Sequence, residues 1–338
     1  MAQVMAGAPI GGAENFYTRM VASLADYSEL TQCAFTRKNE RREGIFRQAG
    51  VPVQTFRLGG PLQFFNNWQY TQALRNWNPD IVLTYMNRAT KLTPQGDYQL
   101  VARLGHYYDL KNYRHCDHWI GITKGICDHL VRGGMPADRV VQIPNFVDEA
   151  DAEPLARTSF NTPEGVPILF ALGRLHTNKA FDILLKALPA IPDAVLWLAG
   201  DGPERESLEA LCRELNIVDR VRFLGWRNDG NALMRTADVF VCPSRHEGLG
   251  SIVPEAWFNR CPMVATNSQG PGELIEHNET GLVTPVDEVE PLSDAINQLL
   301  GNLNAANAMA DRGYQHYLDN YSRKIICQQY VDYFKNIS

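Results

Sequence analysis

Short runs of hydrophobic residues alternate along the chain with longer segments whose hydrophobic positions recur at helical spacing. The hydrophobic runs predict strands at residues 81–84, 119–122, 140–143, 168–172, 195–199, 221–224 and 239–241. The amphipathic segments predict helices at residues 124–132, 181–188 and 204–215. The first of these helices is expected to end at Gly133 and Gly134. Strands that are hydrophobic throughout and alternate with helices are typical of α/β proteins with doubly wound parallel sheets.

A polar, proline-containing stretch interrupts the alternation between residues 148 and 167. Such composition is typical of a linker between domains, and 338 residues are enough for two domains. We therefore predict an N-terminal domain at residues 1–155 and a C-terminal domain at residues 156–320. Residues 321–338 carry many aromatics in a helical pattern, and we expect this C-terminal helix to pack back on the N-terminal domain.

The composition is that of a soluble globular protein, with 45% hydrophobic and 21% charged residues. No stretch reaches the ~18 uncharged apolar residues of a membrane helix, and the N-terminus does not resemble a signal peptide. The seven cysteines are scattered without a C-x-x-C pair, which indicates reduced thiols in a cytoplasmic protein. Cys242 and Cys261 lie in apolar contexts and are predicted core residues.

The net charge of −6 argues against nucleic-acid binding by bulk attraction to phosphate. Basic residues nevertheless gather in one short stretch, which contains Arg37, Lys38, Arg41, Arg42 and Arg47. One interpretation is a solvated helix face. The other is a contact with an acidic acceptor or with anionic lipid, which would place the protein peripherally on the inner face of the cell membrane.

The segment Gly11-Gly12-Ala13-Glu14 follows the first strand and opens a helix. It is not a Walker loop, because Ala13 stands where lysine is required, and its glycine spacing differs from the dinucleotide fingerprint. Gly11 and Gly12 still permit close approach of an anion to the helix N-terminus, although a tight strand-to-helix turn would also explain them.

Two further loops after strands carry positive charge. Arg174 can present a planar fork to phosphate oxygens and Lys179 a point charge, which suits a diphosphate unless both are solvated surface charges. Trp226 and Arg227 follow the strand at residues 221–224, where a loop could hold a base through its backbone.

Glu247 and Glu255 flank a glycine-containing loop between a predicted strand and a predicted helix. We expect Pro254 at the first helical position, so that Glu255 lies at a helix start, where it could simply complement the helix dipole. Between the two acids, amide groups of the loop can face an anion, and both carboxylates can hold hydroxyls. These amides are those of Leu249, Gly250 and Ser251. The combination suits a sugar nucleotide.

Taken together, these motifs resemble retaining glycosyltransferases of family four. The resemblance rests on the two glutamates with seven residues between them, on Arg174 and Lys179 after Gly173, on residues 11–14, and on residues 143–148. It extends in order and spacing over nearly the whole chain. It implies the GT-B architecture, in which two Rossmann-like domains face each other across a cleft, with the nucleotide-sugar donor held mainly by the second domain and the acceptor by the first.

The resemblance also implies roles for single residues. Arg174 and Lys179 would bind the donor diphosphate, Glu255 the ribose and Glu247 the transferred sugar. The amides of Leu249, Gly250 and Ser251 would complete the phosphate cradle, which Gly12 would approach from the first domain. His106 matches a histidine near the reacting centre, although a core or surface histidine would look the same. His115, His118 and His129 match nothing and are predicted to be structural. Phe146 stands where the family often has glycine, and we expect it to alter closure or the acceptor pocket.

The resemblance predicts transfer of a hexose, with retention, from a nucleotide sugar (a UDP-sugar by family frequency) to a hydroxyl of a glycan or glycolipid in lipopolysaccharide or surface polysaccharide synthesis. No Asp-x-Asp motif accompanies the donor residues, so we expect transfer without metal and without a cofactor. Two alternatives stay open: a sugar-nucleotide epimerase of the same fold, and a non-catalytic carbohydrate-binding subunit.

Overall fold

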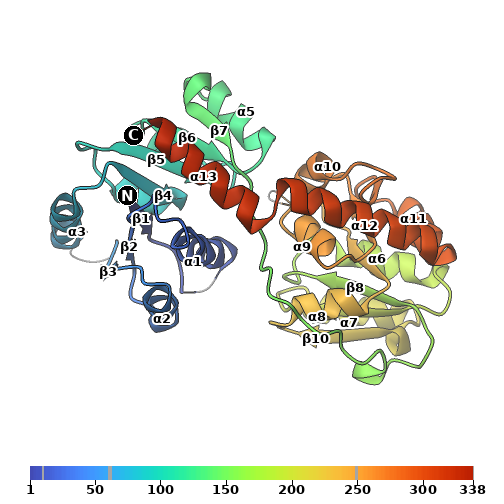
Figure 1. Ribbon diagram of the computed structural model, residues 1–338. Coiled ribbons are helices and arrows are strands. Elements are labelled where there is room, and N and C mark those ends of the chain that lie inside the picture. Colours follow the sequence, from blue (N-terminus) through green and yellow to red (C-terminus); the bar gives the residue numbers. More distant parts are fainter. Residues whose placement is uncertain (10, 60–62, 248–249, 338) are drawn as a thin grey trace. The chain divides into compact units, whose positions relative to one another are not determined.

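A computed structural model describes residues 1–9, 11–59, 63–247 and 250–337, without the side chains of residues 63–66. The chain divides into two compact units (Figure 1). Unit 1 comprises Met1–Phe146 and Ser322–Ser338, and unit 2 comprises Val147–Tyr321. The change from unit 1 to unit 2 therefore comes nine residues before the predicted boundary at residue 156 (156 − 147 = 9).

Unit 1 is built on a parallel sheet in the order β3-β2-β1-β4-β5-β6-β7. Its strands are β1 Ala2–Met5, β2 Cys33–Thr36, β3 Val53–Thr55, β4 Ile81–Tyr85, β5 Gln99–Leu104, β6 His118–Gly121 and β7 Val140–Gln142. Its helices are α1 Gly12–Leu24, α2 Glu40–Gln48, α3 Gln63–Trp77, α4 Met86–Leu92, α5 Lys124–Arg132 and α13 Arg323–Ile337. Short 3-10 turns lie at Leu110–Asn112 and Ala137–Arg139.

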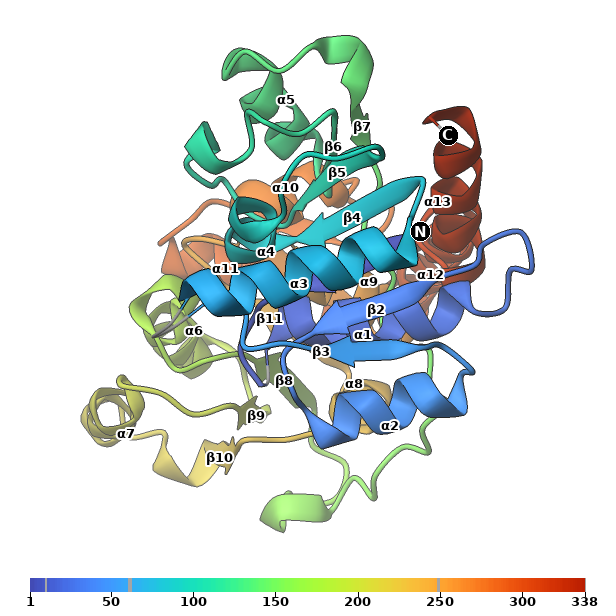
Figure 2. The same ribbon diagram turned by 90° about the vertical axis from the view of Figure 1, so that its left-hand side faces the viewer.

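Helices α1, α2 and α13 pack on one face of this sheet, and α3 lies on the opposite side (Figures 1 and 2). Helix α13 buries Ile326, Tyr330 and Phe334 completely. The last helix of the chain thus supplies part of the core of unit 1.

Unit 2 is built on a second parallel sheet in the order β10-β9-β8-β11-β12-β13. Its strands are β8 Ile168–Leu172, β9 Val195–Ala199, β10 Val221–Gly225, β11 Val239–Cys242, β12 Met263–Thr266 and β13 Leu282–Thr284. Its helices are α6 Phe181–Ala187, α7 Arg205–Glu214, α8 Gly230–Thr236, α9 Ile252–Phe258, α10 Gln269–Leu274, α11 Val289–Gly301 and α12 Leu303–Asn320. Short 3-10 turns lie at Ser159–Asn161, Thr177–Lys179, Leu188–Ala190 and Val218–Arg220.

Alternate residues of one strand of unit 2 enter different cores. In β8, Leu169 and Ala171 join the core formed with α6 and α11, whereas Ile168 and Phe170 join the core formed with α8 and α9. Both faces of the strand are covered because successive side chains point to opposite sides of a sheet. This arrangement explains why the sequence of the strand is hydrophobic throughout.

Several predicted elements are confirmed residue for residue, including the strands at 168–172 and 195–199 and the helix at 124–132. The predicted start of the helix that carries Glu255 is wrong. Helix α9 begins at Ile252, so that Pro254 is its third residue. Proline is tolerated there because the N–H groups of the first turn have no partner within the helix.

Phe146 belongs to the core of unit 1. It is 1% exposed, and its ring lies 5.3 Å from that of Phe16 in α1. Its bulk therefore fills the interior where the first segment of unit 1 ends, and it is not among the residues that line the cavity at the carboxyl edge of this unit.

Candidate active site

The charged loops of unit 2 follow the carboxyl ends of parallel strands, which meet at one edge of the sheet, where open α/β sheets bind their ligands. The loop with Arg174 and Lys179 follows β8, and the loop with Glu247 follows β11, the neighbour of β8. The two loops are therefore adjacent because the strands that carry them are paired.

Lys179 and Glu247 form an ion pair at this edge, between Nζ and Oε2. The two side chains are 24% and 13% exposed. The hydroxyl of Ser244 donates to the same carboxylate oxygen at 3.5 Å. The lysine and the glutamate, which were predicted to bind different parts of one ligand, thus contact each other, and both side chains stay partly exposed.

Backbone contacts join the two loops directly. The carbonyl of Asn178 accepts from the amide of Arg245 at 2.8 Å and from that of His246 at 3.2 Å. The Arg245 guanidinium donates to the carbonyl of Thr177 at 2.7 Å. These contacts hold the segment before Glu247 against the segment before Lys179, so the ion pair rests on a fixed frame.

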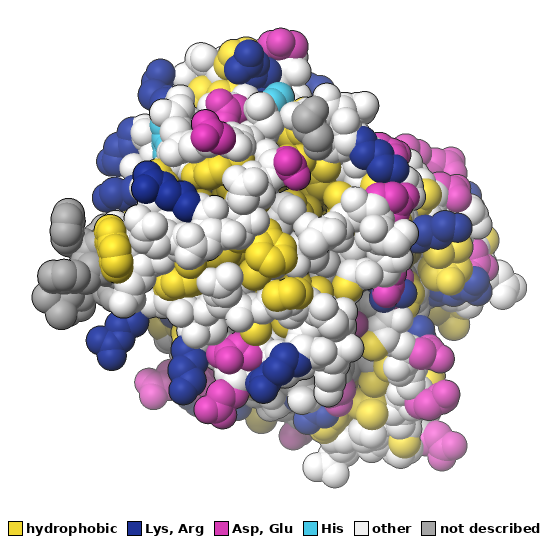
Figure 3. Space-filling model, turned by 60° about the vertical axis from the view of Figure 1, so that its left-hand side comes forward, with side chains coloured by type: hydrophobic (Ala, Val, Ile, Leu, Met, Phe, Trp, Pro, Cys, Tyr) yellow, Lys and Arg dark blue, Asp and Glu magenta, His cyan; other side chains and the backbone are white. Residues whose placement is uncertain are grey.

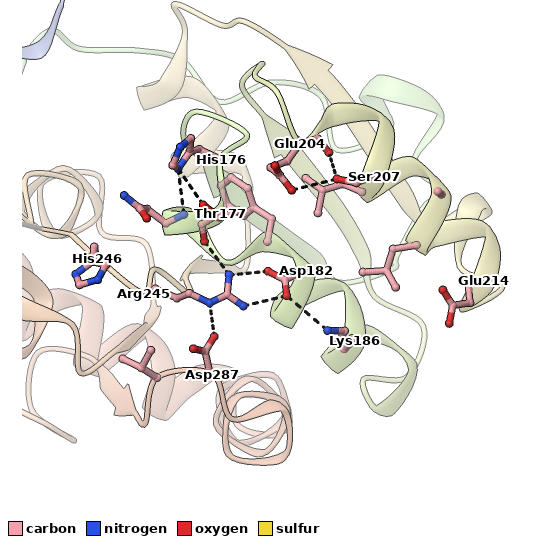
Figure 4. A pocket seen from close by; sticks show the side chains of 16 residues that line it. His176, Thr177, Asp182, Lys186, Glu204, Ser207, Glu214, Arg245, His246 and Asp287 are labelled. Carbon is pink, nitrogen blue, oxygen red and sulfur yellow. Dashed lines mark hydrogen bonds and ion pairs between the residues drawn. The ribbon is translucent and has the colours of Figure 1, made fainter.

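Arg245 is itself anchored by acids of the neighbouring elements, as Figure 4 shows. It forms two hydrogen bonds with Asp182 of α6, at 2.9 and 3.0 Å, and an ion pair with Asp287 at 2.5 Å. Burial raises the pKa of the Asp182 carboxyl, but the hydrogen bonds and charge of Arg245 outweigh this effect, and the pKa is lowered overall. Asp182 is therefore charged at neutral pH and keeps Arg245 in place.

A cavity of about 1010 Å³ opens beside this network. Its lining includes His176, Asp182, Arg245 and His246, but neither Lys179 nor Glu247 (Figure 4). Several charged side chains of the cavity wall form ion pairs with one another. Asp182 pairs with Lys186 and Arg245, and Arg245 also pairs with Asp287 (Figure 4).

Close backbone approaches explain the glycines around the ion pair. A Cβ at Gly173 would lie 3.2 Å from Cε of Lys179, whose aliphatic chain crosses the glycine. Gly250 has φ +54°, and a Cβ there would meet the backbone of Gly270 at 2.9 Å. The amide of Gly270 donates to the carbonyl of Glu247 at 2.7 Å. The loop that carries Glu247 thus packs on the start of α10.

The remaining predicted donor residues of unit 2 have different surroundings. Arg174 is exposed, Ser251 is half-buried at the N-cap of α9, and Glu255 is half-buried in its first turn. Trp226 is 76% exposed. Arg227 forms an ion pair with Asp229, to which its Nε donates at 2.8 Å. None of the contacts among the described residues connects Arg227 with Lys179 or Glu247. Leu249 lies outside the described residues.

Gly12 and His106 lie in unit 1. Gly12 is exposed, and a Cβ on it would meet none of the described atoms within 4 Å, so packing does not require glycine at this position. His106 is exposed after β5, and the ring contacts recorded for it are with Tyr107 and Tyr108. The rings of His115 and His129 bond to backbone carbonyls of Thr93 and Tyr108, as structural histidines do.

With this geometry in view, the chain can be compared with known proteins. Residues 10–151 match the family model described as Glycosyltransferase Family 4, and residues 153–316 match the one described as Glycosyl transferases group 1. The lipopolysaccharide core biosynthesis glycosyltransferase LpsE of Rhizobium meliloti is 30% identical over 325 residues, which are 95% of each chain. The chain belongs to the family-four glycosyltransferases.

Two further proteins resemble the glycosyltransferase over nearly its whole length. LpsD of the same organism, also a lipopolysaccharide core biosynthesis glycosyltransferase, is 29% identical over 96% of this chain and 95% of its own. The Anabaena protein HepE, solved in complex with UDP, has a TM-score of 0.84 over 99% of each chain at 20% identity. This likeness identifies the fold with its two parallel-sheet units as GT-B, and the predicted family and fold class are confirmed.

The basic stretch of the glycosyltransferase separates into residues with different surroundings. Arg42 is only 4% exposed and donates to the hydroxyls of Thr36 and Thr18, so the prediction that it contacts a membrane is wrong. Lys38 and Arg41 are exposed, whereas Arg37 is half-buried and lines a cavity. On the face drawn in Figure 3, basic side chains lie mostly around the margin, and hydrophobic side chains show near the centre. Within the described part of the chain, no helix is long and apolar enough to cross a bilayer.

The sequence interpretation missed Arg245, although it precedes Glu247 by only two residues. An arginine two residues before an acid that is predicted to bind a ligand, in a strand-to-helix loop, could have indicated a second functional charge, since charged residues in such loops need partners. Its partners Asp182 and Asp287 could not be read from the sequence, because they come from α6 and from the segment before α11.

Proposed function

We propose that the glycosyltransferase moves a hexose, with retention of anomeric configuration, from a UDP-sugar to a hydroxyl of a growing lipopolysaccharide core or related surface glycan. The names of LpsE and LpsD support the acceptor class, and the UDP complex of HepE supports the nucleotide. The observation that carries the proposal is the ion pair of Lys179 and Glu247 at the ligand-binding edge of unit 2.

The donor would divide this ion pair. The ammonium of Lys179 and the guanidinium of Arg174 would bind the diphosphate, and Glu247 would accept hydrogen bonds from hydroxyls of the transferred sugar. Glu255, in the first turn of α9, would hold the ribose. The amides of Leu249, Gly250 and Ser251 would complete the phosphate contacts, and Gly12 of unit 1 would leave room for the donor.

The reaction breaks the bond between the anomeric carbon and the phosphate oxygen, and the electron pair leaves with the nucleoside diphosphate. The acceptor hydroxyl forms the new bond on the same face, and its proton passes to an oxygen of the departing phosphate. The transition state resembles an oxocarbenium ion, while negative charge grows on the leaving group. Lys179 and Arg174 are suited to stabilise this growing charge, so we propose that neither a metal ion nor a cofactor is needed. We also propose a role in catalysis for His106, which is exposed after β5.

A donor panel tests the proposal. UDP-glucose, UDP-galactose, UDP-N-acetylglucosamine and GDP-mannose are added separately, and the melting temperature is measured, since a ligand that binds only the folded state stabilises it by about 2.7 kcal/mol at 100 times its Kd. One UDP-sugar should raise the melting temperature most. A rise with GDP-mannose alone would overturn the choice of nucleotide.

Transfer is then measured with the selected donor on isolated core glycan, with and without a metal chelator. Replacing Glu247 by Gln keeps the shape of the side chain and removes its charge, and we expect a loss of roughly 10²–10³-fold in kcat/KM. The matched control is Glu164→Gln, on an exposed loop of the same unit, which should leave transfer unchanged. Unimpaired transfer by the Glu247→Gln variant would contradict the site, and a sugar nucleotide with inverted stereochemistry as product would indicate an epimerase.

A further inference from the structure

A second cavity, of about 880 Å³, lies wholly within unit 1. It is formed by segments at the carboxyl ends of five neighbouring strands, in the order β3, β2, β1, β4 and β5. Its charged lining consists of Arg37, Arg88, Lys91 and Glu14. The carboxyl edge of a parallel sheet is where α/β proteins bind ligands, and this edge presents three cations against one acid.

The acid is already engaged by its own loop. Glu14 is 5% exposed, and its Oε1 accepts from the amide of Ala8 at 2.7 Å. A Cβ at Gly7 or Gly11 would lie only 2.1 or 2.3 Å from a carboxylate oxygen of Glu14. The carboxylate is therefore wrapped by the turn after β1, and its position serves that turn.

The cations, in contrast, have no acid beside them. Among the ion pairs of the described residues, none involves Arg37, Arg88 or Lys91. The hydrogen bond recorded for Arg88 is a long one, 3.4 Å, from Nη1 to the carbonyl of Ala6. The three unpaired positive charges around the cavity repel one another, and an anion in the cavity would relieve that repulsion.

The backbone places two of these cations at the cavity. Helix α4 starts directly after β4, and Met86 at the junction has φ +66°, an unfavourable conformation for a residue with a side chain. The turn lets Asn87, Arg88 and Lys91 reach the cavity from one short helix. Asn87 accepts from the side chain of Asn112 at 2.7 Å, which gives the cavity a polar wall beside the cations.

We propose that this cavity binds an anionic group, a phosphate or a carboxylate, carried by the acceptor sugar. The proposal rests on the proposed function, because it assigns the acceptor to unit 1, and it adds that the acceptor is selected by its negative charge. Arg37 and Arg88 supply planar forks that match phosphate and carboxylate oxygens, and Lys91 adds a point charge. The amides of Asn87 and Asn112 can hold neighbouring hydroxyls. Arg37 therefore has a role in the cavity that the exposed Lys38 and Arg41 do not share.

Two double variants of equal charge test this assignment. Arg37→Gln with Arg88→Gln removes two charges from the cavity, and Lys38→Gln with Arg41→Gln removes two from the nearby exposed surface. The probes are glucose 6-phosphate, glucuronate, glucose and inorganic phosphate, whose dissociation constants are measured by ligand-observed NMR at low ionic strength. UDP binding is measured separately, because it reports on the donor site of unit 2.

We expect glucose 6-phosphate, glucuronate or both to bind the unaltered protein at least about tenfold more tightly than glucose does, which is the scale of one charge-assisted contact. The cavity variant should lose this preference, and the surface variant should keep it within about twofold. Both variants should keep the melting curve and the UDP affinity of the unaltered protein. Added salt should weaken the anionic probes and leave glucose unaffected.

Three outcomes would overturn the proposal: equal affinity for glucose and the charged sugars, equal losses in both double variants, or binding of inorganic phosphate without any gain from the attached sugar. The second outcome would indicate bulk attraction, and the third a free-phosphate site. Failure of UDP to bind would instead contradict the donor site, which leaves the two proposals separable.

Discussion

The charged groups at the carboxyl edges of the two sheets are arranged in opposite ways. In unit 2 two cations near the edge are paired with acids, Lys179 with Glu247 and Arg245 with Asp182 and Asp287, while the exposed Arg174 takes part in none of the ion pairs recorded for the described residues. In unit 1 the cavity presents Arg37, Arg88 and Lys91, none of which takes part in the ion pairs recorded for the described residues. Similar folds therefore carry one edge on which two of three cations are paired with acids and one edge on which all three cations of the cavity are unpaired.

The difference corresponds to two kinds of ligand. A nucleotide sugar has both an anionic diphosphate and neutral hydroxyls, and a lysine–carboxylate pair offers one partner for each. Without a donor, Lys179 and Glu247 neutralise each other's charge. Because each charge compensates the other at a half-buried position, both side chains stay in place. A cavity with three unpaired cations and one acid that is held by its own loop suits a ligand that brings negative charge and no counterion. Each edge should thus respond differently when its charges or its supporting core are altered.

The largest expected effect comes from Phe146, which supports unit 1 only. Phe146→Ala removes a buried ring next to Phe16 and should destabilise unit 1 by about 3–5 kcal/mol. The affinity for UDP, whose proposed site lies in unit 2, should change little. Calorimetric unfolding and a UDP titration measure the two quantities. The control is Trp68→Ala, which deletes an aromatic ring that is 59% exposed and should leave stability nearly unchanged. Loss of UDP binding in the folded Phe146→Ala variant would show that the two units do not act separately.

A smaller effect is expected when one member of the matched pair in unit 2 is removed. Lys179→Ala leaves the Glu247 carboxylate, 13% exposed, without its cation and should destabilise unit 2 by about 1–3 kcal/mol. Lys179→Ala with Glu247→Ala should recover part of that stability, because no unpaired charge remains. Neither variant should transfer sugar. Chemical denaturation of the unaltered protein, of the single variants Lys179→Ala and Glu247→Ala, and of the double variant completes a double-mutant cycle, and additive losses of stability would contradict coupling between the two side chains.

The sequence predicted those parts of the fold whose signal lies in continuous segments. Strand β8 was located to the residue because it is covered on both faces and is therefore hydrophobic throughout. The start of α9 was misplaced because proline is compatible with any position of a first turn, so Pro254 did not locate the first residue. Arg42 was grouped with exposed basic residues, although it lies four positions before Phe46 and shares the buried face of α2 with it.

The candidate sites were predictable to different extents for a physical reason. Arg174, Lys179, Glu247 and Glu255 lie in loops directly after strands or at the start of a helix, positions that a single sequence reveals. The cavity of unit 1 combines segments that follow five strands, among them α4, whose approach depends on the left-handed conformation of Met86. Methionine has no preference for that conformation. The sequence therefore does not predict that Arg37, Arg88 and Lys91 line the same cavity, and only the structure shows it.

The smallest expected effect concerns the acid that anchors Arg245. The pKa of Asp182 is lowered in the folded protein, and an aspartate in the unfolded chain has a pKa of about 3.9. The stabilisation by Asp182 is therefore complete above about pH 5 and is lost as the pH falls through the folded-state pKa. Asp182→Asn should lower stability at pH 7 by less than about 1 kcal/mol, because the side chain is 32% exposed, and the difference should shrink as the pH falls below the unfolded-state pKa.

Melting temperatures of the unaltered protein and of the Asp182→Asn variant, measured from pH 7 to pH 3, should therefore converge as the pH falls. The control is Asp311→Asn, whose partner Arg260 lies 3.5 Å away at an exposed position and should contribute nothing measurable. Because Arg245 also donates to the loop that ends at Lys179, the Asp182→Asn variant should lose several-fold in sugar transfer at pH 7, while the Asp311→Asn variant should not. If the two melting curves stayed parallel over this pH range, Asp182 would not be the group that couples protonation to the frame around Lys179 and Glu247.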